Sequence, residues 1–235
     1  MQTGELLGSG RSADVFAIDD HWVPRRYRDG GDATAEAAVM ACLAERGYPV
    51  PRVRAPVGAG PGHAPRTDLV MQRLHGPSML QALLQGTVTA AEAGSTLADL
   101  LHRLHAVPAR TCADAGHRIL HLDLHPDNVM LTPAGPMVID WRNTEEGPPA
   151  LDWAMSSLIL AQVAVDTTAL AAPARAVLAA LLTHRGPTAV AGNTYAACLM
   201  EARKRRAADP SMNKNESHLL DDAVDLIHEL APARP

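Results

Sequence analysis

Residues 121–128 read HLDLHPDN, which is the stretch of the chain richest in side chains that bind metals or transfer protons. His121, Asp123, His125 and Asp127 alternate, so a β-strand would place them on one face. Histidine and carboxylate groups are ligands of zinc or iron, and a metal-dependent hydrolase built on His121, Asp123 and His125 is one interpretation of this alternation. Such a site needs further ligands, and the remaining histidines of the chain form no second cluster.

A second chemistry uses Asp123 together with the residues that follow it. Asn128 stands five positions later, and two apolar stretches joined by a Pro-Ala-Gly turn form a predicted hairpin that ends at Asp140. Phosphoryl transfer requires a carboxylate that orients the acceptor hydroxyl and takes its proton. It also requires an amide oxygen and a second carboxylate that hold magnesium against the nucleotide phosphates. Asp123 suits the first role, and Asn128 and Asp140 suit the second.

HLDLHPDN followed by MVIDW, within residues 121–153, resembles the catalytic and metal-binding loops of the aminoglycoside phosphotransferase and choline kinase-like family. That family consists of small-molecule kinases with the protein-kinase fold. The resemblance implies an α+β, bilobal protein-kinase-like fold with a small β-rich N-lobe and a mostly helical C-lobe. It also implies ATP and Mg²⁺ as cofactors, with Asp123 as the catalytic base and Asn128 and Asp140 as the metal ligands.

The predicted secondary structure is consistent with this fold. Residues 4–30 are predicted to form strands and turns, residues 68–71 form a further strand, and the chain after Gly76 is mostly helical. Helices are predicted over residues 33–46, 78–85, 90–106, 151–165, 167–184, 188–207 and 216–230. Strands first and helices later indicate an α+β arrangement, with an N-lobe over residues 1–74 and a C-lobe over residues 75–235.

The resemblance implies a glycine-rich loop that covers the nucleotide phosphates. Residues 8–15, GSGRSADV, have the first two glycines and the valine at the expected spacing, and Ala13 replaces the third glycine. An ordinary Gly-Ser-Gly turn is the alternative. The predicted nucleotide contacts in this stretch are Gly8, Ser9, Gly10 and Val15.

The family also has a basic residue on the third strand, paired with a glutamate of the following helix. The only lysines of the chain are Lys204 and Lys214, so the usual lysine is absent. Arg25 takes its position in the stretch Trp-Val-Pro-Arg, and Glu36 is the matching partner. A guanidinium can bind phosphate oxygens with two hydrogen bonds, although it is not equivalent to an ammonium group. Two exposed surface charges are the alternative.

Residues 69–76, LVMQRLHG, resemble the segment that joins the lobes and binds adenine through its backbone. The expected contacts are the backbone groups of Gln72 and Leu74, and a strand followed by a turn is the alternative. Asp152 resembles an aspartate at a helix start that supports the catalytic loop. His121 is expected to hydrogen-bond the backbone of that loop. His125 and Asp127 either shape it or lie near the acceptor.

Leu122 stands where many protein kinases have an arginine that binds a phosphorylated activation loop. The absence of this arginine and the short run from Asp140 to Pro149 predict a small-molecule substrate rather than a protein. Carboxylates of the helical part would suit a cationic acceptor, although solvated helix faces are the preferred explanation for any one of them. These residues are Glu145, Glu146, Glu201, Glu216, Asp221, Asp222 and Asp225.

The composition argues against several classes of function. A net charge of −5 and an aromatic content of 3% argue against a nucleic-acid-binding protein. The apolar stretch from Leu151 to Val165 is too short and too often interrupted by polar residues to span a membrane. Cys42, Cys112 and Cys198 are scattered, and no signal-peptide pattern is evident, so we expect a cytoplasmic protein with no obligate protein partner.

The sequence therefore predicts an ATP-dependent phosphotransferase that acts on a hydroxyl of a small molecule, such as an aminoglycoside or an amino alcohol. Catalysis would rest on positioning and charge neutralisation. The alternative is a nucleotide-binding pseudokinase that senses or scaffolds. Arg25 in place of a lysine and Ala13 in place of a glycine motivate this alternative.

Overall fold

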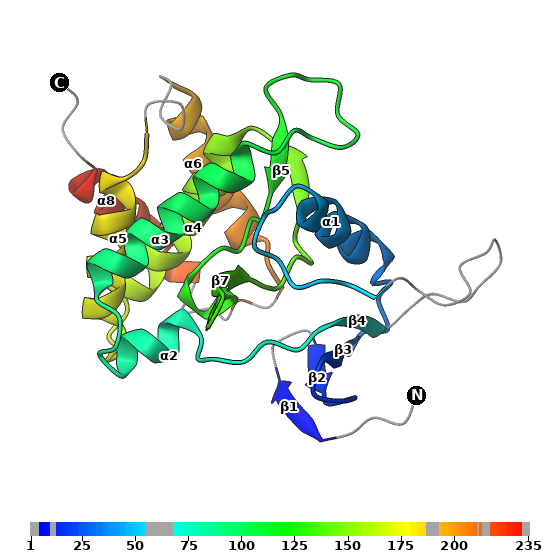
Figure 1. Cartoon of the computed structure of the whole chain (residues 1–235). Coiled ribbons are helices and arrows are strands. Elements are labelled where there is room, and N and C mark those ends of the chain that lie inside the picture. Colours follow the sequence, from blue (N-terminus) through cyan, green and yellow to red (C-terminus); the bar gives the residue numbers. More distant parts are fainter. Residues whose placement is uncertain are drawn as a thin grey trace. The chain divides into compact units, whose positions relative to one another are not determined.

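A computed structural model describes residues 5–9, 13–54, 68–186, 193–210, 212 and 217–231. The chain forms two compact units. The first consists of Met1–Gly76 and Met130–Arg142, and the second consists of Pro77–Val129 and Asn143–Pro235. The first unit contains an antiparallel sheet and one long helix, and the second contains most of the helices (Figure 1).

The sheet of the first unit has its four strands in chain order. They are β1 (Leu6–Ser9), β2 (Ala13–Phe16), β3 (Trp22–Tyr27) and β4 (Asp68–Gln72). In β3, Val23, Arg25 and Tyr27 share one face, as alternate residues of a strand do, and all three are buried; Pro24 is buried on the other face. Arg26 lies on the other face, where its guanidinium forms two hydrogen bonds of 2.7 Å to the carboxylate of Asp68.

Helix α1 (Thr34–Glu45) buries Glu36, Met40 and Leu43, which recur at the three- and four-residue spacing of one helix face. After the helix, the backbone carbonyl of Pro49 accepts a hydrogen bond of 2.8 Å from the Val138 N–H. The ring of Tyr48 meets the indole of Trp141 edge to face, with 5.5 Å between ring centroids. These contacts attach residues of the 130–142 segment to the N-terminal part of the same unit.

The hairpin predicted before Asp140 is formed by β6 (Val129–Thr132) and β7 (Gly135–Val138). Gly76 lies against it with a φ of +138°, in the region that only glycine adopts without strain. A Cβ atom at this position would lie 2.0 Å from the carbonyl oxygen of Leu131. Gly76 is therefore required both for its backbone conformation and for the close approach to the hairpin.

The second unit contains most of the helices, and α4 lies at the centre of its packing. The helices of this unit are α2 (Met79–Leu84), α3 (Ala90–His105), α4 (Pro149–Val165), α5 (Ala171–Thr183), α6 (Asn193–Ala207) and α8 (Leu220–Leu230). Every residue of α4 from Ala150 to Gln162 is buried, and the helix contacts α5, α6 and α8. A helix that is buried on all sides is a core helix. No helix in the described part of the chain has the length and apolar character needed to cross a membrane.

Helices α3 and α5 pack closely because α3 has a glycine at their contact. A Cβ atom on Gly94 would lie 2.4 Å from the Cβ of Ala180 and 2.8 Å from the Val177 carbonyl oxygen. Capping boxes begin two helices of this unit, at Ser78 for α2 and at Thr89 for α3. The helix predicted from residue 167 begins later, at Ala171.

The 121–128 segment is not a strand. A short strand β5 (Arg118–Leu120) pairs with β8 (Glu145–Gly147) and ends before His121, and residues Pro126–Asn128 form a turn of 3₁₀ helix, η1. The alternation on one strand face that a metal-dependent hydrolase would need is therefore absent. Strand β8 was not predicted, because Glu-Glu-Gly has no apolar alternation.

Candidate active site

The 121–128 loop of the second unit is anchored by Asp152, in the first turn of α4. The side chain of Asp152 is fully buried, and its two carboxylate oxygens accept the backbone N–H groups of His121, at 2.9 Å, and Leu122, at 2.8 Å. Nε2 of His105, the last residue of α3, lies 3.1 Å from the same carboxylate. Burial opposes ionisation, but the hydrogen bonds from His105 and from the His121 backbone lower the pKa of Asp152 below its usual value.

Leu122 adopts a left-handed backbone conformation, with a φ of +62°. This region is unfavourable for a residue with a branched side chain, and it persists only where the surrounding structure holds it. The two hydrogen bonds to Asp152 hold the backbone on either side of the His121–Leu122 peptide. The resulting change of chain direction leads directly into Asp123, whose side chain is 26% exposed.

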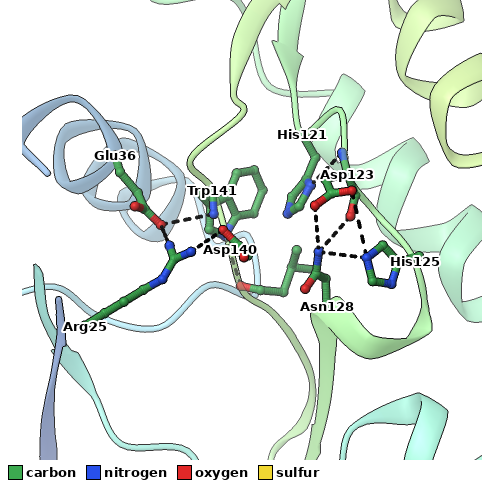
Figure 2. Close-up of polar contacts among 9 residues, drawn as sticks. Arg25, Glu36, His121, Asp123, His125, Asn128, Asp140 and Trp141 are labelled. Carbon is green, nitrogen blue, oxygen red and sulfur yellow. Dashed lines mark hydrogen bonds and ion pairs between the residues drawn. The ribbon is translucent and has the colours of Figure 1, made fainter. Parts of the chain in front are cut away.

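Asn128 links the two ends of the loop. Its Nδ2 donates a hydrogen bond of 2.9 Å to the backbone carbonyl of Asp123 and lies 3.4 Å from the Asp123 carboxylate (Figure 2). The same nitrogen lies 3.2 Å from Nε2 of His125. Because the amide nitrogen is engaged by the loop, the amide oxygen is the atom of Asn128 left to bind a cation.

The histidines of the loop interact with its backbone. His121 is fully buried, and its Nδ1 accepts the N–H of Asp123 at 3.2 Å. Nδ1 of His125 accepts the N–H of Asp127 at 3.3 Å, and the Asp127 carboxylate accepts a hydrogen bond of 2.8 Å from Ser78 Oγ. The described residues contain no group of three or more His, Cys, Asp or Glu side chains arranged to hold a metal ion.

The first unit contains a second polar cluster, formed by Arg25, Glu36, Asp140 and Trp141 (Figure 2). Nη1 of Arg25 donates to Glu36 Oε1 at 2.6 Å, and Nη2 forms an ion pair with Asp140. The same Glu36 oxygen accepts the backbone N–H of Trp141 at 3.1 Å. The side chains of Arg25 and Glu36 are 7% and 4% exposed and that of Asp140 is 35% exposed, so the cluster has one accessible carboxylate.

This Arg25 cluster holds two carboxylates, one buried and one partly exposed, against a single guanidinium. Burial raises the pKa of Glu36 above its usual value; the charge of Arg25 opposes this effect, and the charge of Asp140 adds to it. Oε2 of Glu36 is buried with no hydrogen-bond partner among the described residues. Asp140 has a left-handed backbone, with a φ of +64°, as Leu122 does in the other unit.

The remaining predicted nucleotide contacts also lie in the first unit. Gly8 of β1 is opposite Val15 of β2, and Ser9 ends β1. Gly10 lies outside the described residues. Gln72 ends β4 and donates its backbone N–H to the Arg52 carbonyl at 2.8 Å. Leu74 follows in the segment after the strand.

Several acidic residues considered for a cationic acceptor have partners within the second unit. Arg205 pairs with both Glu145, at 2.7 Å, and Glu201, at 2.9 Å, and Arg203 pairs with Asp221 at 2.6 Å. The pairs with Glu145 and Asp221 connect α6 to β8 and to α8, and the pair with Glu201 lies within α6, so these ion pairs account for the charges without an acceptor.

Glu146 is a further residue whose role the sequence did not reveal. Its carboxylate accepts the backbone N–H groups of Arg110, Thr111 and Cys112 and the hydroxyl of Thr111. Although burial opposes it, this set of hydrogen bonds lowers the pKa of Glu146 to about 2. No local pattern marks Glu146 or His105, because their partners lie 34 to 47 residues away along the chain.

Comparison with known proteins identifies the family. Residues 3–119 and 115–193 match the family model described as the phosphotransferase enzyme family. No curated protein matches the sequence of this chain significantly.

Solved structures share the fold at low sequence identity. An amicoumacin kinase, hAmiN, in complex with AMP-PNP, Ca²⁺ and Ami has a TM-score of 0.55 at 10% identity, over 98% of this chain and 90% of that one. The gentamicin complex of APH(2")-IIa has a TM-score of 0.54 at 12% identity, over 97% and 91%. A choline/ethanolamine kinase family protein from Mesorhizobium loti has a TM-score of 0.53 at 16% identity, over 96% and 87%. The predicted α+β protein-kinase-like fold is confirmed.

Proposed function

Because the chain belongs to the phosphotransferase enzyme family, we propose that it transfers the γ-phosphate of ATP to a hydroxyl of a small molecule. The observation that carries this proposal is the 121–128 loop, in which Asn128 is hydrogen-bonded to Asp123 and the backbone is anchored by Asp152. In this proposal the N-lobe of residues 1–74 binds the nucleotide, and the C-lobe of residues 75–235 carries the catalytic loop.

Asp123 is the proposed catalytic base. Its carboxylate is partly exposed, while its backbone is fixed at the N–H by His121 and at the carbonyl by Asn128. A fixed backbone limits the positions of the side chain, which favours a defined orientation of the acceptor hydroxyl. The proton of that hydroxyl passes to the Asp123 carboxylate as the phosphoryl group is transferred.

Asn128 and Asp140 are the proposed magnesium ligands. Amide and carboxylate oxygens are the ligands that Mg²⁺ prefers, so the residues fit the ion. The amide oxygen of Asn128 is not used by the loop, and the Asp140 carboxylate is 35% exposed. The bound ion would neutralise charge on the nucleotide phosphates.

Arg25 is the proposed phosphate-binding residue, supported by Glu36. Its Nη1 is held by Glu36, whereas its Nη2 is engaged by Asp140. A cation bound at Asp140 would compete with Nη2, which would then be available to a phosphate oxygen. Gly8, Ser9, Gly10 and Val15 are proposed to cover the phosphates, and the backbone of Gln72 and Leu74 is proposed to contact adenine.

We propose an aminoglycoside or an amino alcohol as the acceptor class. Structures of similar fold include a gentamicin complex and a choline/ethanolamine kinase family protein, which supports this class. The absence of an arginine at Leu122 also supports a small molecule rather than a protein.

The test is release of ADP from Mg-ATP across a panel of aminoglycosides, amino alcohols, sugars and nucleosides. Asp123→Asn keeps the size of the side chain and removes the base, so turnover of any accepted substrate is expected to fall about 10²- to 10⁴-fold. Asp127→Asn is the matched control, because it changes a carboxylate of the same loop that is engaged by Ser78. Equal turnover in the Asp123 variant and the control would remove Asp123 from the mechanism.

One observation favours the second candidate, a nucleotide-binding pseudokinase. Nη2 of Arg25 forms an ion pair with Asp140, so a guanidinium engages the carboxylate that is proposed to bind magnesium. This candidate predicts that ATP raises the melting temperature of the protein, with no ADP release against any acceptor of the panel. ADP release that depends on Asp123 excludes it.

A further inference from the structure

The face of the sheet opposite Arg25 carries a separate group of aromatic and basic side chains. In the pairing of β3 with β4, Trp22 lies opposite Gln72, and Arg25 lies opposite Leu69. Because strand residues alternate, Trp22 and Gln72 lie on the face opposite Arg25. Residues 52–54 extend this sheet, since Gln72 N–H donates to the Arg52 carbonyl at 2.8 Å.

A cavity of about 580 Å³ opens on this face. It is lined by Asp20, His21, Trp22, Arg52, Gln72, Arg73 and His75. Cavities of roughly 300 to 1,000 Å³ with an apolar floor and a few convergent polar groups are typical of small-molecule sites. Two guanidinium groups and two imidazoles in one cavity are unexpected in a chain whose net charge is −5. This concentration indicates a negatively charged ligand.

Arg52 is the basic group best placed to bind an anion. The side chain is exposed, and among the described residues no carboxylate lies within ion-pair distance of its guanidinium. Arg73 is less available, since its Nη1 donates to the Asp19 carbonyl at 3.2 Å and lies 4.0 Å from the carboxylate of Asp20. That carboxylate belongs to a side chain that is 98% exposed, so it neutralises Arg73 only weakly.

The indole of Trp22 supplies the aromatic surface of the cavity. The guanidinium of Arg54 lies over this ring, with 4.6 Å between Cζ and the ring centroid, which braces the ring. The turn before Trp22 is fixed as well, because the Asp19 carboxylate accepts the N–H groups of His21 and Trp22 at 2.7 and 2.8 Å. The amide NH₂ of Gln72 is a neutral hydrogen-bond donor among the groups that line the cavity.

We propose that this cavity binds a small aromatic anion, such as an aryl phosphate or an aryl carboxylate. The ring of the ligand packs against Trp22, and its anionic group accepts hydrogen bonds from Arg52 and from the donors of His21 and Gln72, whereas Nε2 of His75 is engaged by the Asp20 carbonyl at 3.4 Å. Charge-assisted hydrogen bonds from a planar guanidinium favour carboxylate and phosphate groups. The site uses none of the side chains proposed for phosphoryl transfer, so it extends the proposed function rather than restating it.

Tryptophan fluorescence tests the proposal directly. Of the three tryptophans, Trp141 and Trp153 are fully buried, and Trp22 alone is partly exposed. Phenyl phosphate and benzoate are expected to bind saturably and to change the emission, and the stronger of the two identifies the preferred anionic group. Inorganic phosphate and benzyl alcohol, which lack the ring and the charge respectively, are expected to bind at least tenfold more weakly.

Two variants locate the binding. Arg52→Gln is expected to weaken binding about tenfold, since it removes one charge-assisted contact. Arg46→Gln, which changes an exposed arginine at the end of α1, is the matched control and is expected to bind as the unmodified protein does. Asp140→Asn, which is proposed to weaken magnesium binding, is expected to bind the aromatic anions with unchanged affinity. A failure of the proposed function would therefore not alter this result.

The emission change is expected to disappear in Trp22→Phe. Its persistence there, or an affinity unaltered by Arg52→Gln in a variant with normal thermal unfolding, overturns the proposal. Absence of saturable binding for both aromatic anions at millimolar concentration overturns it equally.

Discussion

Asp140 and Asp123, the two carboxylates proposed to act on the nucleotide and the acceptor, are held in different ways. Asp140 interacts with the guanidinium of Arg25, in a cluster of opposite charges. Asp123 lies in a loop whose backbone donates two hydrogen bonds to the buried carboxylate of Asp152. An ion pair can be exchanged for another cation, whereas a backbone conformation fixed by hydrogen bonds cannot. We therefore expect ligands to rearrange the Arg25 cluster and to leave the 121–128 loop unchanged.

Asp152→Asn is expected to have the largest effect, because no ligand can replace the hydrogen bonds that hold the 121–128 loop. The amide group supplies one acceptor where the carboxylate supplies two, so a buried backbone N–H of His121 or Leu122 loses its partner. The expected loss in the free energy of unfolding is about 3–5 kcal/mol, measured by urea denaturation. Added Mg-ATP is not expected to restore it. Asp99→Asn, on the exposed face of α3, is the control and is expected to change little. A loss no larger than that of the control contradicts the anchoring role of Asp152.

Arg25→Ala is expected to have a smaller effect that ligands can reverse. Removing the guanidinium leaves Glu36 buried beside Asp140, and the expected loss in the free energy of unfolding is about 2–3 kcal/mol. Because Asp140 is then no longer paired with Arg25, Mg²⁺ is expected to raise the melting temperature of this variant more than that of the unmodified protein.

The adjacent residue of β3 provides the control for Arg25→Ala. Arg26→Ala removes an exposed ion pair to Asp68 on the other face of the strand, so it is expected to change little and to leave the response to Mg²⁺ unaltered. If Mg²⁺ shifts the melting temperature of both variants and the unmodified protein equally, Arg25 and a cation do not compete at Asp140.

Glu146→Gln extends the comparison to pH, with a smaller effect. The backbone N–H groups around residues 110–112 lower the pKa of Glu146 to about 2, from an ordinary value of 4.5. Between these values the unfolded chain binds more protons than the folded protein, so the stabilisation by Glu146 is lost as the pH falls. Partial exposure limits the effect to about 1 kcal/mol. Unfolding at pH 5 and pH 3 should show a weaker acid destabilisation in the variant than in the unmodified protein. The same loss in both would show that these hydrogen bonds do not depend on the charge.

The sequence predicted the residues of the two polar clusters better than it predicted how they are held. The spacing from Asp123 to Asn128 is local, and the likeness of Trp-Val-Pro-Arg to the family's third strand was enough to select Arg25 as the partner of Glu36. The pairing of Arg25 with Asp140 joins residues 115 positions apart, and no pattern within either stretch encodes it.

The residues that hold the 121–128 loop could not be predicted either, because they too depend on contacts between distant parts of the chain. The left-handed backbone of Leu122 could not be predicted, because leucine does not favour that conformation and only Asp152 imposes it. His105 is the last residue of an amphipathic helix, and nothing near it in the sequence indicates a contact with Asp152. Its contact with Asp152, 47 residues away, depends on how α3 packs beside α4.

Glu36→Gln tests the Arg25 cluster by pH, and the expected pH dependence has the opposite sign to that of Glu146. Burial raises the pKa of Glu36, so above its ordinary value of 4.5 the folded protein binds more protons than the unfolded chain. The contribution of Glu36 to stability therefore falls as the pH rises through that window. Glu36→Gln removes this fall while keeping an acceptor for Arg25 and the Trp141 N–H. Urea unfolding from pH 4.5 upward should show a smaller decline in the variant. A steeper decline in the variant would mean that Arg25 stabilises the charge of Glu36 more than burial opposes it. The stabilisation by Glu36 would then be lost as the pH falls, as it is for Glu146.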